Sequence, residues 1–219
     1  MKILAIEFSS AQRSVAVVQK GRDNMLRATE VIETGGRAIR GLGAIEESLR
    51  QARIELEQID CIAVGLGPGS YTGIRAAIAL AQGWQLAREV KLVGVSSAEA
   101  IVAQAQADGL QGLVHVVVDA QRNELYWAVY QMDRTTRRQV APLRLATVAD
   151  VRASQGSGII VGPEVTTWFP AGRIITPRAA TVGELALYQR DFVSGDKLEP
   201  IYLREITFVK APLPRIMTQ

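Results

Sequence analysis

The chain has 219 residues, with 25 Lys and Arg against 22 Asp and Glu, and a single cysteine. This length suffices for one large domain or for two small lobes, each with a core. One cysteine excludes an internal disulfide framework and favours a reducing compartment. No run reaches about 18 consecutive apolar residues, the length that spans a membrane as a helix. A net charge of +3, spread along the chain, does not by itself indicate nucleic-acid binding. We therefore expect a soluble, cytoplasmic protein without a membrane anchor.

The first half of the chain reads as three strands followed by alternating helices and strands. Its β-prone runs predict strands at 2–8, 14–18, 25–32, 61–65 and 91–95. Apolar spacing predicts one helix over 38–52 and another over 70–88. Ser96 and Glu99 have the spacing of a capping box, which predicts a third helix that ends near residue 107 and joins two halves.

The second half repeats this order of elements. Strands are predicted at 113–119, 124–131, 138–145, 159–161 and 174–175. Thr147 and Thr181 each precede an acidic residue by three positions, which predicts two helix starts. The repeated order is that of the duplicated ribonuclease-H-like unit of actin-like ATPases. We predict a two-lobed actin-like α/β fold with lobes at 1–108 and 109–219, the terminal segment being able to pack back on the first lobe.

A glycine-rich turn, GLGPGSYTGIR at 65–75, opens the second predicted helix. Its bare backbone N–H groups could cradle a phosphate, or the turn could simply aim the helix. Along the helix, small residues recur every four positions and form a ridge with Ile74 beside it: Gly69, Gly73, Ala77 and Ala81. A ridge this small permits close approach, either to the chain's own sheet or to a partner helix.

This turn, together with the AAIALAQG that follows it, resembles the signature of the bacterial TsaB (YeaZ) family. Three further segments are similar to that family and occur in the same order: ILAIEFSS with SVAVV, DAQRNELYWAVY, and PIYLR. The resemblance implies the same two-lobed architecture, closed by the PIYLR segment. It also implies a non-catalytic role in making threonylcarbamoyladenosine, a tRNA modification beside the anticodon.

The resemblance further implies partners: a metal-binding TsaD-type transferase, a TsaE-type ATPase, and tRNA reached through the complex. A homodimer is expected when the chain is alone. We expect the contact on the helices that begin near residues 38 and 70, at Ile39, Leu42, Gly69, Ser70, Tyr71, Gly73, Ile74, Ala77 and Ala81. The chain departs from the family at Glu7 and Phe8, where aspartate and threonine are usual, and it lacks a histidine-serine pair within 34–40.

Two carboxylates, Glu7 and Asp119, end the first strand of each half. Working actin-like ATPases place metal-holding or water-orienting carboxylates there. The equally plausible alternative is a carboxylate satisfied by turn amides. Phe8 and Ala120 replace the glycines that phosphates require, so we expect Phe8 to obstruct the site. Ser9 and Ser10 could still bind an anion. These residues predict a degenerate cleft that holds no cofactor.

The remaining chemically active side chains read as core residues. His115, the only histidine, lies in the middle of an apolar strand, and Cys61 lies in another apolar run. No histidine pair or Cys/His cluster exists to bind a metal. Alternation places Tyr126 and Tyr130 on one strand face and Trp127 on the other, which favours packing over stacking on RNA bases.

The sequence therefore favours a scaffold and activator over an enzyme. Two alternatives stay open. The first is an ATP-dependent phosphotransferase of the sugar-kinase type, with Glu7 and Asp119 holding Mg²⁺. The second is a direct tRNA-binding module, whose affinity should fall steeply with salt concentration.

Overall fold

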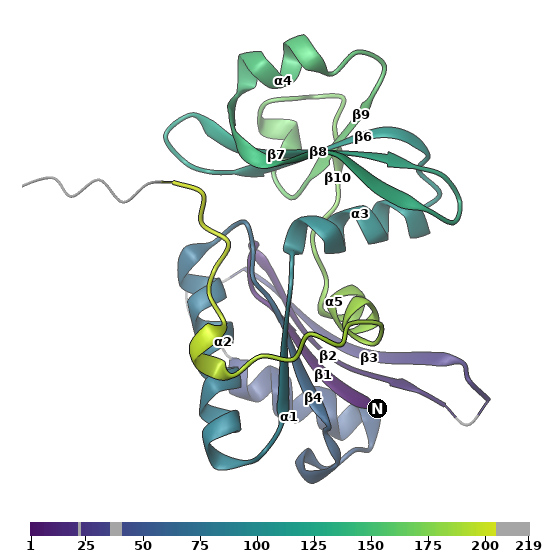
Figure 1. The fold of residues 1–219 in the computed structure, drawn as a ribbon, viewed down its shortest axis with the longest axis vertical. Coiled ribbons are helices and arrows are strands. Elements are labelled where there is room, and N and C mark those ends of the chain that lie inside the picture. The colour runs from purple at the N-terminus through teal and green to yellow at the C-terminus, as the bar shows by residue number, and fades with distance from the viewer. Residues whose placement is uncertain (22, 36–40, 205–219) are drawn as a thin grey trace, which may run out of the picture.

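The computed structural model describes residues 1–21, 23–35 and 41–204. Two five-stranded sheets organise these residues into two lobes, and Figure 1 shows the second lobe above the first with helix α3 (Ser97–Ala107) between them. The predicted residue Ile39 lies outside the described residues.

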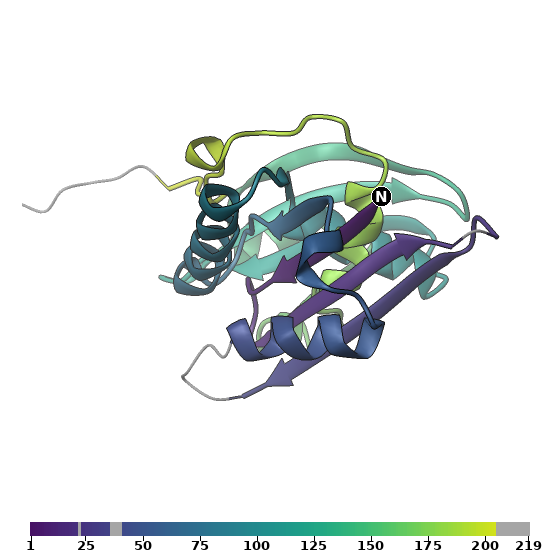
Figure 2. The ribbon, with the colours of Figure 1, turned by 90° about the horizontal axis from the view of Figure 1, so that it is seen from below.

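The sheet of the first lobe has the order β3-β2-β1-β4-β5. The three N-terminal strands pair antiparallel, and the later two join in parallel. The strands are β1 (Lys2–Glu7), β2 (Gln12–Lys20), β3 (Leu26–Thr34), β4 (Cys61–Gly65) and β5 (Lys91–Val95). Helix α1 (Gly41–Ala52) packs on β2 and β3, while α2 (Tyr71–Ala87) packs on β4, β1 and β5. Figure 2 shows both helices on the same side of the sheet.

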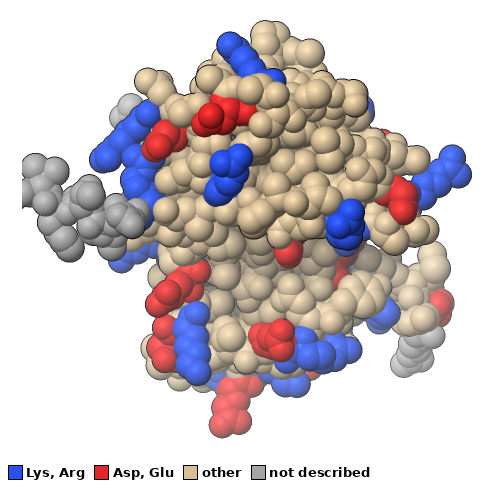
Figure 3. Space-filling view, turned by 45° about the horizontal axis from the view of Figure 1, so that its top comes forward, with Lys and Arg blue, Asp and Glu red and all other residues tan. Residues whose placement is uncertain are grey.

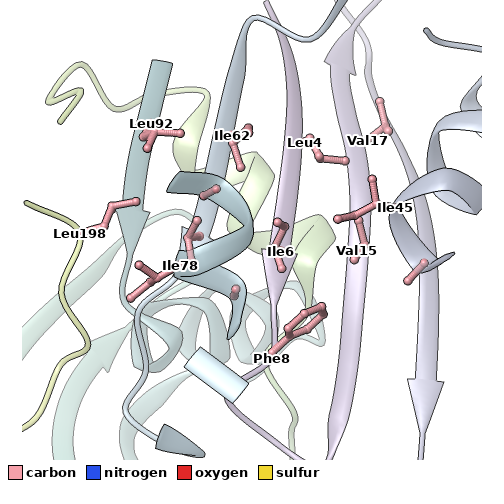
Figure 4. Close-up of a cluster of buried hydrophobic side chains, with 14 of the residues drawn as sticks. Leu4, Ile6, Phe8, Val15, Val17, Ile45, Ile62, Ile78, Leu92 and Leu198 are labelled. Atoms are coloured by element: carbon pink, nitrogen blue, oxygen red, sulfur yellow. The ribbon is translucent and has the colours of Figure 1, made fainter. Parts of the chain in front are cut away.

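Both faces of this sheet are buried, because its central strands are apolar at nearly every position. Leu4 and Ile6 point toward α1 and α2, as the close-up in Figure 4 shows. Ile3 and Ala5 point to the opposite face, where helix α5 (Ala179–Ala186) covers them. Strand alternation thus divides the first lobe into two separate cores.

The second lobe repeats the first, with the order β10-β9-β6-β7-β8. Its elements are β6 (Gly112–Asp119), β7 (Glu124–Met132), β8 (Arg137–Thr147), α4 (Val148–Ser154), β9 (Ile159–Gly162) and β10 (Arg173–Ile174). The counterpart of α2, between β9 and β10, is reduced to a 3-10 turn at Val165–Thr167. Helix α3 covers one face of this sheet and α4 the other. The duplicated order confirms the predicted fold.

Helix α5 corrects the predicted helix start, because it begins at Ala179 rather than at Thr181. It packs on β1 and β2 of the first lobe although its sequence follows the second lobe. Long-range contacts fix its start. The Ser14 hydroxyl accepts from the Ala179 N–H at 2.8 Å, and the Glu30 carboxylate accepts from the Ala180 N–H at 3.1 Å and pairs with Arg178. The boundary at residue 108 itself remains a prediction.

The two other capping patterns differ in outcome. Thr147 and Asp150 do exchange hydrogen bonds at the start of α4. Ser96 is the N-cap of α3, but its side chain makes no capping bond. The next residue, Ser97, uses its hydroxyl for two hydrogen bonds. It donates to Glu7 and accepts from the Gly67 N–H at 3.1 Å, so it ties the helix to the first lobe.

Candidate functional site

The glycine-rich turn lies directly against the segment that follows β1. A Cβ on Gly69 would collide with the Ser9 carbonyl oxygen, and one on Gly73 would collide with that of Phe8. The Ser70 N–H donates to the Ser9 carbonyl at 2.7 Å. Glycine is therefore needed at these positions so that the two backbone segments can touch.

The first turn of α2 directs two amides at its own chain. Besides the Ser70 N–H, the Gly73 N–H donates to the Ser70 hydroxyl at 3.3 Å, as an N-cap does. Of the two roles considered for the turn, aiming the helix is the one that these contacts support.

The ridge of small residues on α2 faces the first sheet. Ala77 and Ala81 are fully buried, and Gly73 and Ile74 are buried beside them. Small side chains let the helix axis approach β4 and β1 closely. The ridge predicted to meet a partner is thus an intramolecular contact, and only the other predicted positions remain near the surface.

The opposite side of α2 and the adjoining side of α1 form an exposed surface, which we call the outer face. Leu42 and Tyr71, both predicted for the interface, are 63% and 51% exposed there. The two helices meet where Gly41 approaches Leu80. The other exposed residues of the outer face are Gly43, Thr72, Arg75, Ala79, Gly83 and Leu86.

A cleft of about 1080 Å³ opens between the lobes. The first lobe lines it with Ser9, Ser10, Gly69, Ser70 and Tyr71, and the second with Asp119, Gln121, Tyr126 and Glu164. Its size is that of a small-molecule site. Three of the four predicted cleft residues, Ser9, Ser10 and Asp119, line this cleft.

The fourth, Glu7, does not reach the cleft. Its side chain is fully buried, and both oxygens are engaged. Oε1 accepts from the Ser9 N–H at 2.7 Å, and Oε2 accepts from the Ser97 hydroxyl at 2.7 Å. Burial raises the pKa of this carboxyl group above its usual value, although the hydrogen bonds oppose the shift. Glu7 joins β1 to α3 and is unavailable to a metal or nucleotide here.

On the second lobe, Asp119 has a neighbour that the sequence analysis missed. Asp119 accepts from the backbone N–H and the side-chain amide of Gln121, each at 2.7 Å. Glu164 follows β9 and lines the same cleft. Burial, followed by the negative charge of Asp119, raises the pKa of Glu164. Since β6 and β9 are parallel neighbours, their carboxyl ends meet at one sheet edge, and this rule could have found Glu164.

Phe8 does not obstruct the cleft in the way predicted. Its ring points into the core between β1 and the helices (Figure 4), and the residue is 2% exposed. Ala120 is likewise buried, in the core of the second lobe. The backbone of residues 8 and 9 lies against the N-terminus of α2, where the glycine-rich turn holds it.

The remaining predicted core residues are buried. His115 is buried in β6, and its Nδ1 accepts from the Trp127 indole N–H at 3.2 Å. Cys61 is buried, which raises the pKa of its thiol to about 12. Tyr126 and Tyr130 belong to one core and Trp127 to the other, so packing accounts for all three, as predicted.

Three further observations concern surface charge, possible metal ligands and membrane-spanning helices. On the face shown in Figure 3, Lys and Arg side chains are interspersed with Asp and Glu rather than gathered in a basic band. Within residues 1–21, 23–35 and 41–204, no three His, Cys, Asp or Glu side chains cluster closely enough to hold a metal ion. No helix in the described part of the chain is long and apolar enough to cross a membrane.

Two similar sheets with a cleft between them define a two-lobed actin-like α/β protein. A family model described as TsaD: tRNA N6-adenosine threonylcarbamoyltransferase matches residues 39–204. The chain is 28% identical to the tRNA threonylcarbamoyladenosine biosynthesis protein TsaB of Escherichia coli (strain K12), over 97% of this chain and 99% of that protein. The protein of the same name from Bacillus subtilis (strain 168) is 27% identical over 68% of this chain and 64% of that protein.

Solved structures agree on the fold. YeaZ from Pseudomonas aeruginosa has a TM-score of 0.78 and 24% identity, covering 92% of this chain and 99% of that chain. The chain belongs to the TsaD-type tRNA N6-adenosine threonylcarbamoyltransferase family and, within it, to the TsaB (YeaZ) group, which takes part in tRNA threonylcarbamoyladenosine biosynthesis.

Proposed function

We propose that this chain is a non-catalytic, cytoplasmic scaffold and activator of the complex that forms threonylcarbamoyladenosine on tRNA. The observation that carries the proposal is the state of Glu7. The first-lobe carboxylate that a working relative would direct into the cleft is here fully buried and bonded to Ser9 and Ser97. A carboxylate held in this way cannot bind a metal or orient a water molecule without breaking the junction of β1 with α3.

The partner we propose is a TsaD-type transferase, bound on the outer face of α1 and α2. Two glycines favour helix packing there, because a Cβ added to Gly43 or Gly83 would meet no other atom within 4 Å. Leu42 and Leu86 supply exposed apolar surface, with Leu86 91% exposed. Two such helices can form a four-helix contact with a like pair, which makes the same face suited to a homodimer when the chain is alone.

In this proposal Gly69 lies against Ser9, Ile39 is outside the described residues, and the other predicted interface residues divide into two groups. Leu42, Ser70 and Tyr71 are exposed and would contact the partner directly. Gly73, Ile74, Ala77 and Ala81 are buried and place α2 on its sheet, so that the outer face has the right shape. A TsaE-type ATPase would join the resulting assembly, and tRNA would be bound through the complex.

Light scattering on a sizing column tests the proposal, with the chain alone and mixed with the TsaD-type protein of the same source. We expect a homodimer that exchanges into a heterodimer. Ala79→Arg, on the outer face, should remain folded and weaken the heterodimer at least about tenfold, as charged substitutions in an interface core do. Ala153→Arg on exposed α4 is the matched control and should bind normally. A heterodimer unaffected by Ala79→Arg would refute the proposed surface.

One observation favours a second function, that of an ATP-dependent phosphotransferase. Asp119 and Glu164 both line the cleft, and two carboxylates at the ends of parallel strands could hold Mg²⁺ with bound phosphates. Isothermal titration with Mg²⁺ and ATP decides this point. Saturable binding by the isolated chain, with hydrolysis lost in Asp119→Asn, would establish the enzyme and remove the non-catalytic proposal.

A further inference from the structure

The C-terminal segment from Gly195 to Arg204, which we call the strap, runs along the first lobe and ends on the second. Figure 1 shows it passing α2 and then rising toward the upper sheet. Its beginning is fixed to α2. The Gln82 side-chain amide donates to the Gly195 carbonyl at 2.7 Å, and the Gly195 N–H donates to Gln85 at 2.6 Å.

The middle of the strap is held in the first lobe by apolar and backbone contacts. Leu198 belongs to the core beneath α2. The Ile201 N–H donates to the carbonyl of Leu66, which lies in the glycine-rich turn, at 2.8 Å. The Tyr202 ring then contacts the ring of Tyr71, the first residue of α2, with centroids 5.8 Å apart. Up to this point the strap is part of the first lobe.

Arg204 makes the contact with the second lobe. Its Nη2 donates to the Ala120 carbonyl at 2.9 Å and to Glu124 Oε2 at 2.7 Å. Both acceptors flank the turn that joins β6 to β7. Tyr202 and Arg204 also line the cleft, so the strap forms one of its walls and connects its two sides.

The turn that Arg204 contacts has an unusual backbone. Gln121, Arg122 and Asn123 all have positive φ values, of 61°, 58° and 62°. Residues with a Cβ disfavour this left-handed region, so the turn depends on its hydrogen bonds. The Ala120 N–H donates to the Glu124 carbonyl at 3.0 Å, and the Glu124 N–H donates to the Gln121 carbonyl at 3.1 Å. Arg204 adds a contact from about 80 positions away in the sequence.

We propose that the strap holds the cleft closed and that the Arg204 guanidinium is its releasable latch. The contact is suited to release, because a single nitrogen makes the bonds and Glu124 is 39% exposed, so water can replace the arginine. The hydrogen bonds and core contacts that hold the earlier part of the strap lie in the first lobe and need not break when the lobes separate. On the cleft side, opening requires loss of the Arg204 bonds, while the junction of Glu7 with Ser97 at the start of α3 stays intact.

Distances between the lobes test the latch. Spin labels at Glu46→Cys on α1 and Ala153→Cys on α4 occupy exposed sites on opposite lobes. The native Cys61 is fully buried and does not compete for label. Pulsed electron paramagnetic resonance of the labelled chain, diluted with an excess of unlabelled chain so that distances across a homodimer do not contribute, should give one narrow distance for the otherwise unchanged chain. In Arg204→Ala we expect a second, longer distance that comes from chains with an open cleft. The ratio of closed to open chains should fall about tenfold.

Arg88→Ala is the matched control, since Arg88 pairs with Glu57 entirely within the first lobe. It should leave the distances unchanged. Glu124→Gln weakens the latch from the other lobe and should open the cleft to a smaller extent. If circular dichroism shows that Arg204→Ala does not fold, the distances in Glu124→Gln are compared with those in Arg88→Ala instead. Distances in Arg204→Ala and Glu124→Gln that match those of Arg88→Ala would overturn the proposal.

Discussion

The Glu7 carboxylate accepts a hydrogen bond from the Ser97 hydroxyl at 2.7 Å, a contact between residues 90 positions apart that joins the end of β1 to the start of α3. Because α3 is also packed on the second sheet, this bond lies where the two lobes meet. A position at which the sequence predicted either cleft chemistry or a satisfied carboxylate is here part of the structural junction.

Replacing this carboxylate should therefore destabilise the fold. In Glu7→Ala the Ser9 N–H and the Ser97 hydroxyl both lose their acceptor in a buried site, at a cost of about 2–4 kcal/mol. Urea unfolding followed by circular dichroism measures the loss. Glu46→Ala, on the exposed side of α1, is the control and should change stability by less than about 0.5 kcal/mol. Equal stability of the two variants would show that Glu7 is not a structural residue.

The inward direction of the α2 ridge predicts a large effect at Ala77. Ala77→Arg places an unpaired charge in a fully buried site, so we expect a chain that is largely unfolded or aggregated at 25 °C. Ala79→Arg, two residues away and exposed, should keep a melting temperature close to that of the unchanged chain. Melting curves of the two variants compare the faces directly. A folded Ala77→Arg would mean that α2 presents its small residues outward.

His115 predicts a loss of stability in mild acid. Burial lowers the pKa of its imidazole below the ordinary value of about 6.5, so the folded chain disfavours the protonated form. The unfolded chain binds that proton more readily. Stability should fall as the pH drops below about 6.5, the unfolded value, toward the lowered folded value.

The comparison for His115 is His115→Gln, which keeps an acceptor for Trp127 and does not titrate. Since the chain has only one histidine, the difference in unfolding free energy between the two proteins isolates its contribution from those of the acids. We expect that difference to change steadily as the pH falls below about 6.5. A difference independent of pH would exclude a lowered pKa.

The contact between Glu30 and α5 gives a fourth prediction. Glu30→Gln keeps the shape but removes the charge that pairs with Arg178 and caps the helix. The side chain of Glu30 is 6% exposed, so we expect a cost of about 1–3 kcal/mol, the range for hydrogen bonds to charged groups. Hydrogen exchange should localise the change to residues 179–186. Equal hydrogen-exchange rates at residues 179–186 in the variant and in the unchanged chain would show that the Glu30 contact does not stabilise α5.

Local patterns in the sequence were sufficient to predict the order of strands and helices. Apolar alternation in 2–8 and 61–65, and turn residues between the strands, determine these elements from neighbours alone. The order of elements then restricts the topology, because parallel strands need helical crossovers. The predicted start of α4 was also correct, because both residues of its capping box, Thr147 and Asp150, lie within one helical turn.

The errors concern contacts between distant positions. Thr181 matched a capping pattern, but Ser14 and Glu30 support an earlier start of α5. The small residues of α2 suit a sheet as well as a partner, so spacing alone could not orient them. In the cleft, the sequence identified Asp119 but not Glu164 or Arg204, whose positions depend on the assembled fold.

Helix α5 and the strap have a consequence for how the chain folds during synthesis. The first lobe contains residues from both ends of the chain, and the face formed by Ile3, Ala5 and Val18 is covered only when residues 179–186 arrive. Synthesis is directional, so the strands of the second lobe emerge before that cover does. The N-terminal sheet therefore carries an open apolar face until residues 179–186 have been synthesised. The lobe whose strands are synthesised first is therefore the lobe whose core is completed last.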